Sequence, residues 1–78
     1  MKIEQIFGTN LQEHRLSSKM SQEELAFNSG LDRTYISLLE RGKRKPTINT
    51  LFSVTRALNV HPFQLIKELE QRLSGEQL

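Results

Sequence analysis

The sequence contains no cysteine. This absence excludes a disulfide framework and any metal site made of thiolates, and it favours a reducing compartment. No apolar run reaches the length of a membrane span, and residues 1–8 lack the apolar core of a secretion signal. We therefore expect a soluble protein of the cytoplasm.

Side chains that carry catalysis are also scarce. The only histidines are His14 and His61, and the sequence has no nucleophile elbow, no glycine-rich phosphate loop and no spaced set of metal ligands. The adjacent Glu23 and Glu24 are better explained as negative charge at a helix N-terminus. The sequence thus predicts no enzyme, no cofactor and no metal site.

The length of 78 residues leaves room for one small domain and not for two. Because burial scales poorly at this size, a compact helical bundle, stabilised further by dimerisation, is the natural solution. No linker, internal repeat or low-complexity segment interrupts the chain. The predicted domain therefore spans residues 1–78.

Two short helices joined by a tight turn are predicted in the middle of the chain. Ser21 and Glu24 form the pattern of a capping box, in which each side chain accepts a hydrogen bond from the other residue's backbone N–H. Gly30 can take the left-handed conformation that ends the first of these helices. Asp32 is the N-cap candidate of the second helix, and Gly42 ends it.

The second of these helices has one apolar face and one mostly polar face. Ile36 and Leu39 supply its buried stripe. Tyr35 is expected to be half-buried with its hydroxyl at the rim, where it can contact a phosphate or a backbone group. The outer face carries Arg33, Thr34, Ser37 and Leu38.

The N-terminal segment predicts another helix, from Ile3 to about Ser18. Gly8 inside it is tolerated at some cost in helix propensity. His14 is most simply a histidine at the edge of the bundle with one hydrogen bond, and a functional switch is the alternative. The stripe at helical spacing consists of Ile3, Ile6, Phe7, Leu11 and His14.

The C-terminal half predicts two more helices, so the fold class is all-α. The first has Thr47 as its N-cap candidate and ends before Asn59. The second begins near Pro62 and extends to about Ser74, and residues 75–78 are expected to fray. Their apolar stripes are Leu51, Val54, Thr55 and Leu58 in one, and Leu65, Ile66, Leu69 and Leu73 in the other.

Five short motifs follow one another in the middle of the chain: Ser21-Gln-Glu-Glu-Leu-Ala26, Ser29-Gly-Leu31, Tyr35-Ile-Ser37, Leu39-Glu-Arg-Gly42 and Pro46. Together they resemble the helix-turn-helix of the phage-repressor and Cro-like (xenobiotic response element) family of bacterial transcriptional regulators. With weaker similarity on both sides, the resemblance covers about Phe7 to Ile66. It implies a five-helix, lambda-repressor-like bundle, bacterial or phage-encoded, whose third helix is the recognition helix. The run from residue 31 to 37 is also similar to restriction-modification controller proteins.

The resemblance implies double-stranded DNA as the partner, with the recognition helix in the major groove. The net charge is only +2, but five of the eleven basic residues lie between Arg33 and Pro46; a solvated loop is the alternative explanation. Contacts to base edges are expected from Arg33, Thr34, Ser37 and Leu38. Contacts to phosphates are expected from Gln22, Tyr35, Arg41, Lys43, Arg44 and Lys45.

The resemblance also implies a structural ion pair between Arg15 and Glu40, which would tie the first helix to the third. The alternative is an exposed Arg15. At Lys19 the family often has glycine, so the turn before Met20 can differ here.

Several apolar side chains fall outside the predicted stripes. Because family members often pair through their C-terminal part, Ile48, Phe52 and Phe63 are expected at a dimer interface. The alternative is a satellite core under the fifth helix. Phe27 also lies off the buried face of its helix.

The predicted function is a transcriptional regulator that binds a pseudo-palindromic operator as a homodimer. Its half-site centres would be about one helical turn, roughly 10 base pairs, or a multiple of it apart. The alternative is an antitoxin-like protein-interaction module that uses exposed aromatic residues, Phe27 among them. Activator, repressor and restriction-modification controller are not distinguished, because that depends on where the operator lies.

Overall fold

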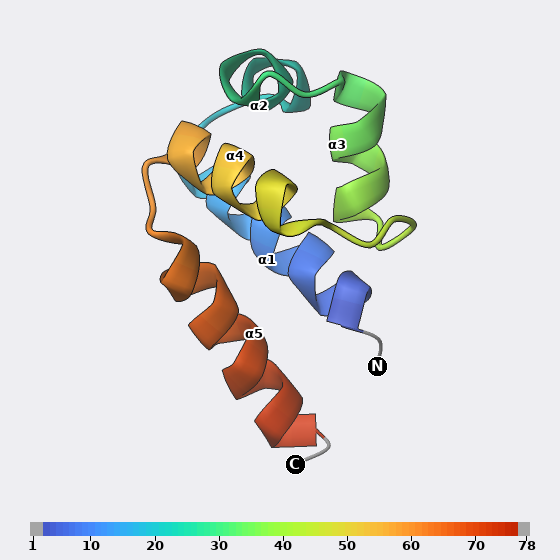
Figure 1. Ribbon diagram of the computed structural model, residues 1–78, viewed down its shortest axis with the longest axis vertical. Helices are drawn as coiled ribbons and strands as arrows, with labels where there is room; N and C mark the ends of the chain where they lie inside the picture. The colour runs from blue at the N-terminus through green and yellow to red at the C-terminus, as the bar shows by residue number, and fades with distance from the viewer. Residues whose placement is uncertain (1–2, 77–78) are drawn as a thin grey trace.

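The computed structural model describes residues 3–76, and within that range it contains five α-helices and no strand. The predicted all-α, five-helix class is confirmed. Figure 1 shows α2 and α3 at one end of the molecule, α1 and α4 in the middle, and α5 running toward the other end. None of the described helices is both long and apolar enough to cross a membrane. The helices are α1 (Ile3–Ser17), α2 (Gln22–Ser29), α3 (Arg33–Glu40), α4 (Ile48–Leu58) and α5 (Pro62–Glu76).

The ends of α2 follow from local side-chain chemistry. The Glu24 N–H donates to the Ser21 hydroxyl over 3.0 Å, and the Ser21 N–H donates to the Glu24 carboxylate over 2.8 Å. This reciprocal pair is the predicted capping box. Gly30, with φ of 73°, adopts the left-handed conformation that ends the helix, as expected for a residue without a Cβ.

The next two helices also begin with an N-cap side chain, without the reciprocal bond of a capping box. Asp32 accepts from the Thr34 N–H at the start of α3, and Thr47 accepts from the Thr50 N–H at the start of α4. Asn59 ends α4 with φ of 60°, a conformation that asparagine tolerates better than most residues. The predicted N-caps and the predicted end of α4 are confirmed.

The core lies between the five helices. Its buried side chains come from all five helices, and Met20, Leu31, Tyr35, Ala57 and Val60 pack against it. The buried stripe predicted for α4 is present in full. The core cluster consists of Phe7, Leu11, Leu25, Ala26, Ile36, Leu39, Leu51, Val54, Leu58 and Leu65.

Four details differ from the expectations. Ile3 and Ile66, both assigned to apolar stripes, are exposed, because both line an open groove between α1, α4 and α5. Asn10 is buried instead, and neither polar atom of its amide has a hydrogen-bond partner in the described chain.

α5 continues to Glu76, two residues beyond the expected end; residues 77–78 of the segment expected to fray lie outside the described residues. α1 ends at Ser17, one residue early.

Gly8 has a structural role that its helix propensity did not indicate. A Cβ at this position would lie 2.3 Å from the Leu39 carbonyl oxygen and 2.7 Å from that of Glu40. The backbone of α1 therefore touches the C-terminal end of α3 directly, and no larger residue fits without a shift of the backbone. This contact sets how closely the C-terminal end of α3 packs against α1.

Candidate nucleic-acid interface

The outer face of α3 is presented to solvent over a fully buried inner face. Ile36 and Leu39 have no exposed surface and anchor the helix in the core. Arg33 and Thr34 are exposed, whereas Ser37 and Leu38 are half-buried. The four side chains expected to contact bases thus lie along one accessible side of the helix, with its N-terminal end the more open.

A basic loop follows α3 directly. Gly42 has φ of 71°, and a Cβ there would approach the Cγ of Gln5 to 2.8 Å, so the loop folds tightly back against α1. All four basic side chains are exposed, and none forms an ion pair with another described residue. These cations can therefore neutralise an external anion. They are Arg41, Lys43, Arg44 and Lys45.

Tyr35 connects α3 to α4. Its half-buried hydroxyl lies 2.9 Å from the hydroxyl of Thr50, which is itself 3.1 Å from that of Thr47. The expected partner was a phosphate or a backbone group, and the structure instead gives a side-chain hydroxyl. Since a phenol has both a donor and acceptor sites, this bond does not exclude a phosphate, and that contact stays a prediction.

Arg15 and Glu40 form a buried, two-pronged ion pair between α1 and α3. Arg15 Nε donates to Glu40 Oε2 over 2.6 Å, and Arg15 Nη2 donates to Glu40 Oε1 over 3.1 Å. Arg15 Nη1 also donates to the carbonyl of Met20 over 2.8 Å. The side chains are 9% and 1% exposed, so the alternative of an exposed Arg15 is wrong.

Gln22 is drawn into the same network. Its Nε2 donates to Glu40 Oε1 over 3.0 Å, which brings the first residue of α2 against the last residue of α3. The first N–H groups of a helix have no intrahelical acceptor, so this end of α2 offers donors beside the basic loop. We call the outer face of α3, the N-terminus of α2 and the basic loop the recognition surface.

Exposed apolar side chains gather elsewhere. Ile48, Phe52 and Phe63 are 70%, 50% and 66% exposed, so they do not form a satellite core under α5, and that alternative is wrong. Ile48, Ile3 and Ile66 line an apolar groove of about 210 Å³ between α1, α4 and α5. Phe52 lies one turn beyond Ile48, and Phe63 one turn before Ile66. We call the five residues Ile3, Ile48, Phe52, Phe63 and Ile66 the apolar face.

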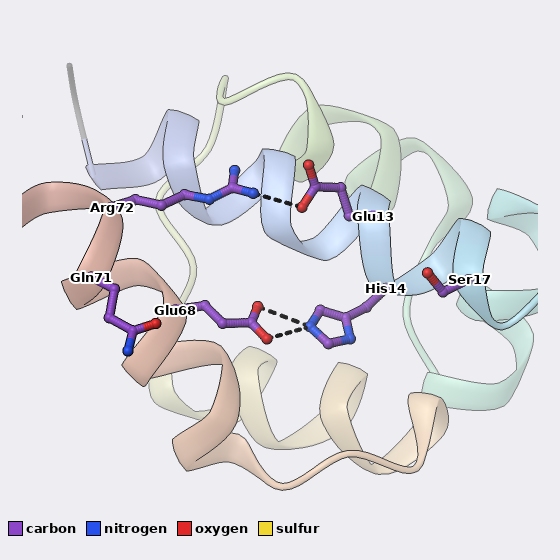
Figure 2. A pocket seen from close by; sticks show the side chains of 6 residues that line it. All are labelled: Glu13, His14, Ser17, Glu68, Gln71 and Arg72. Carbon is purple, nitrogen blue, oxygen red and sulfur yellow. Dashed lines mark hydrogen bonds and ion pairs between the residues drawn. The ribbon is translucent and has the colours of Figure 1, made fainter. Parts of the chain in front are cut away.

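A second, polar cavity of about 460 Å³ lies between α1 and α5. Figure 2 shows His14 and Glu68 facing each other across it, with Arg72 reaching Glu13 alongside. His14 Nε2 lies 2.9 Å from Glu68, and Arg72 Nη2 lies 2.8 Å from Glu13. These contacts fasten α5 to α1, and His14 is the edge histidine that was expected. No cluster of metal-ligating residues occurs in residues 3–76.

Comparison with known proteins agrees with this arrangement. The helix-turn-helix family model matches residues 11–65. The chain belongs to this family. Its predicted type, the repressor and Cro-like (xenobiotic response element) regulators with a controller-like sequence, is confirmed.

Three relatives illustrate the relationship. Control protein C.BamHI of Bacillus amyloliquefaciens is 45% identical over 65 residues, which cover 82% of this chain and 80% of that protein. Control protein C.SmaI of Serratia marcescens is 40% identical over 77 residues, which cover 99% and 89%. The crystal structure of the restriction-modification controller protein C.AhdI from Aeromonas hydrophila matches with a TM-score of 0.78 and 40% identity, over 80% of this chain and 94% of that one.

In this helix-turn-helix regulator, α2 and α3 are the two helices of the motif. Sequence reasoning did not find the bonds that Gln22 and Tyr35 make within the protein, because each partner lies in a different helix. It also missed Ile3 and Ile66 as neighbours of Ile48. The only available signal was that all three are large apolar residues. The predicted bundle has too few neighbouring helices to bury all of them.

Proposed function

We propose that this regulator binds double-stranded DNA in a sequence-specific manner, with α3 in the major groove. The observation that carries the proposal is the juxtaposition of an accessible outer face on α3 with four exposed basic side chains immediately after it, none of which pairs with an acidic group in residues 3–76. A DNA duplex offers closely spaced phosphates beside readable base edges, which matches this pairing of cations with a protruding helix.

The two parts of the recognition surface take different roles. Arg33 can bind guanine through two parallel hydrogen bonds, and Leu38 can contact a thymine methyl group. Thr34 and Ser37 can reach other base edges. The basic loop and the N-terminus of α2 bind phosphates, which fixes the register of the protein on the duplex without selecting a sequence.

The regulator binds its operator as a symmetric homodimer through the apolar face. Three of the five apolar-face residues line one groove, and a two-fold interface would bury the face against its copy. Two recognition helices then meet two half-sites, so the operator is a pseudo-palindrome with half-site centres about 10 base pairs, or a multiple of it, apart. The similarity to control proteins supports a role in controlling the genes of a restriction-modification system.

Selection of bound duplexes from a random pool tests this function. A recurrent, two-fold symmetric sequence is expected among the selected duplexes. Enrichment of no sequence, or of a single asymmetric half-site, would contradict specific binding or the dimer, respectively.

Sedimentation of the Phe52→Asp plus Phe63→Asp variant tests the interface. The variant should sediment as a monomer, because two carboxylates would have to be buried in the dimer. Phe27→Asp is the matched control, since Phe27 is 86% exposed and lies on α2, a helix that contributes no residue to the apolar face. If the double variant sediments like the wild type, the assignment of the interface is wrong.

A protein-interaction module remains the second candidate, and Phe27 is the observation that favours it. A wild-type protein that selects no duplex and whose Phe27→Asp variant loses a protein partner would support this candidate instead.

A further inference from the structure

One hydrogen bond joins the two helices of the recognition surface. Gln22 at the start of α2 donates through Nε2 to Oε1 of Glu40 at the end of α3. The same carboxylate accepts two bonds from Arg15. Three N–H groups therefore converge on Glu40, whose side chain is only 1% exposed.

This arrangement determines the orientation of the Gln22 side-chain amide. A carboxylate accepts hydrogen bonds and cannot donate them, so the NH₂ end of the amide must face Glu40. An NH₂ group carries two protons, and Glu40 uses one of them. The second proton remains available, as do the N–H groups of Gln22 and Glu23, since the Ser21 hydroxyl takes only the N–H of Glu24.

The charge of Glu40 does not oppose a phosphate at this place. Arg15 compensates it through two hydrogen bonds, and burial keeps the carboxylate away from the surface. Glu40 thus orients a neutral donor at the edge of the recognition surface without presenting its own negative charge. A long side chain that is already oriented loses less conformational freedom when it binds.

We propose that Glu40 is a positioning residue for DNA. By holding Gln22, it aims the second Nε2 proton, together with the first N–H groups of α2, at one phosphate. This inference rests on the proposed function, and it gives Glu40 a role beyond its ion pair with Arg15.

The first measurement compares operator affinity across a series of salt concentrations. Gln22→Met keeps the length of the side chain and removes its hydrogen bonds, so affinity should fall about two- to tenfold, the range expected for one hydrogen bond. The salt slope should not change, because the lost donor is neutral, whereas loss of one cation at Lys43 lowers the slope by roughly one unit. Gln71→Met is the matched control, because Gln71 lies on α5 in the polar cavity.

The second measurement asks whether Glu40 acts through Gln22. Exchange of a buried ion pair for apolar residues as a pair is often neutral for stability, so Arg15→Met plus Glu40→Met removes the acceptor of Gln22 in a folded protein. Its affinity should fall, but by less than that of Gln22→Met, because an unoriented Gln22 can still donate to the phosphate. Addition of Gln22→Met should then cause a smaller loss than it does in the wild-type background. A further loss as large as in the wild-type background would overturn the proposal.

The third measurement uses the wild-type protein and so does not depend on any variant folding. In nitrogen-15 spectra of the free protein, one Gln22 NH₂ proton should show the downfield shift of a carboxylate-bound proton. On saturation with the selected duplex, that proton should keep its shift and the other should move. Loss of the first shift, or no movement of the second proton, contradicts the proposal.

The outcomes distinguish a failure of this inference from a failure of the proposed DNA binding. A wild-type protein that binds no duplex rejects both. A wild-type protein that binds its operator no more tightly than Gln22→Met rejects the role of Gln22 and Glu40 alone.

Discussion

The recognition surface and the apolar face differ in how their side chains are held. Behind the recognition surface, Tyr35 is hydrogen-bonded to Thr50, and at its edge Gln22 is hydrogen-bonded to Glu40. What the surface itself offers is a set of cations and N–H donors. On the apolar face, the side chains are large and exposed. The first surface is thus prepared for an anion of fixed shape. The second gains free energy from any apolar surface that covers it, at about 25 cal/mol for each Å² buried.

The largest expected effect tests the close backbone contact between α1 and α3, the helix that carries the recognition surface. Gly8→Ala places a Cβ 2.3 Å from the Leu39 carbonyl oxygen, so the free energy of unfolding should fall by about 4 kcal/mol. Gly75→Ala on α5 is the control, because its Cβ would meet no atom within 4 Å. Urea unfolding of both variants measures the difference. Equal stability of the two would show that α1 and α3 are not in close contact.

The next effect tests the ion pair that ties α1 to α3. Arg15→Ala and Glu40→Ala should each lower the free energy of unfolding by about 3 kcal/mol, because each leaves a buried charge without a partner. The double variant should lose less than the sum of the two. Thermal or urea unfolding of the three variants provides the cycle, and strictly additive losses would contradict a direct pair.

Affinity for single-base operator variants separates the two parts of the recognition surface. Arg33→Ala should cost about 1–3 kcal/mol of binding free energy and relax the preference for one guanine. Leu38→Ala should relax the preference for a thymine elsewhere in the half-site. Lys43→Ala should weaken all sequences about equally and lower the salt slope by roughly one unit. A uniform loss for Arg33→Ala would assign that residue to the phosphate backbone.

The smallest effect concerns the turn between α1 and α2, which leads into the N-terminus of α2. Lys19 has φ of 59°, a left-handed conformation that a residue with a Cβ adopts at a cost. Lys19→Gly should therefore raise the free energy of unfolding by about 0.5–1 kcal/mol. Asn59→Gly is the comparison, since Asn59 has φ of 60° but tolerates it better, and it should gain less. A loss of stability in Lys19→Gly would show that the lysine side chain contributes more than its strain costs.

Local chemistry made most of the helices predictable. The capping box at Ser21 and the left-handed Gly30 and Asn59 each depend on a few neighbouring residues. A short stretch of sequence is therefore enough to predict these helix ends. The buried stripe of α4 was predictable for the same reason, because helical periodicity places its residues on one face. The ion pair of Arg15 was implied by family resemblance, and spacing alone does not indicate it.

The sequence by itself determined where α2, α3 and α4 begin and end, which face of α3 is polar and where the cations concentrate. Only the tertiary structure decided which atoms meet across helices: the Gly8 backbone against Leu39, Gln22 against Glu40, and the isoleucines that line one groove. The physical reason is that these contacts depend on the relative placement of helices, which is set by packing of the whole core. A residue's own sequence neighbourhood does not contain that information.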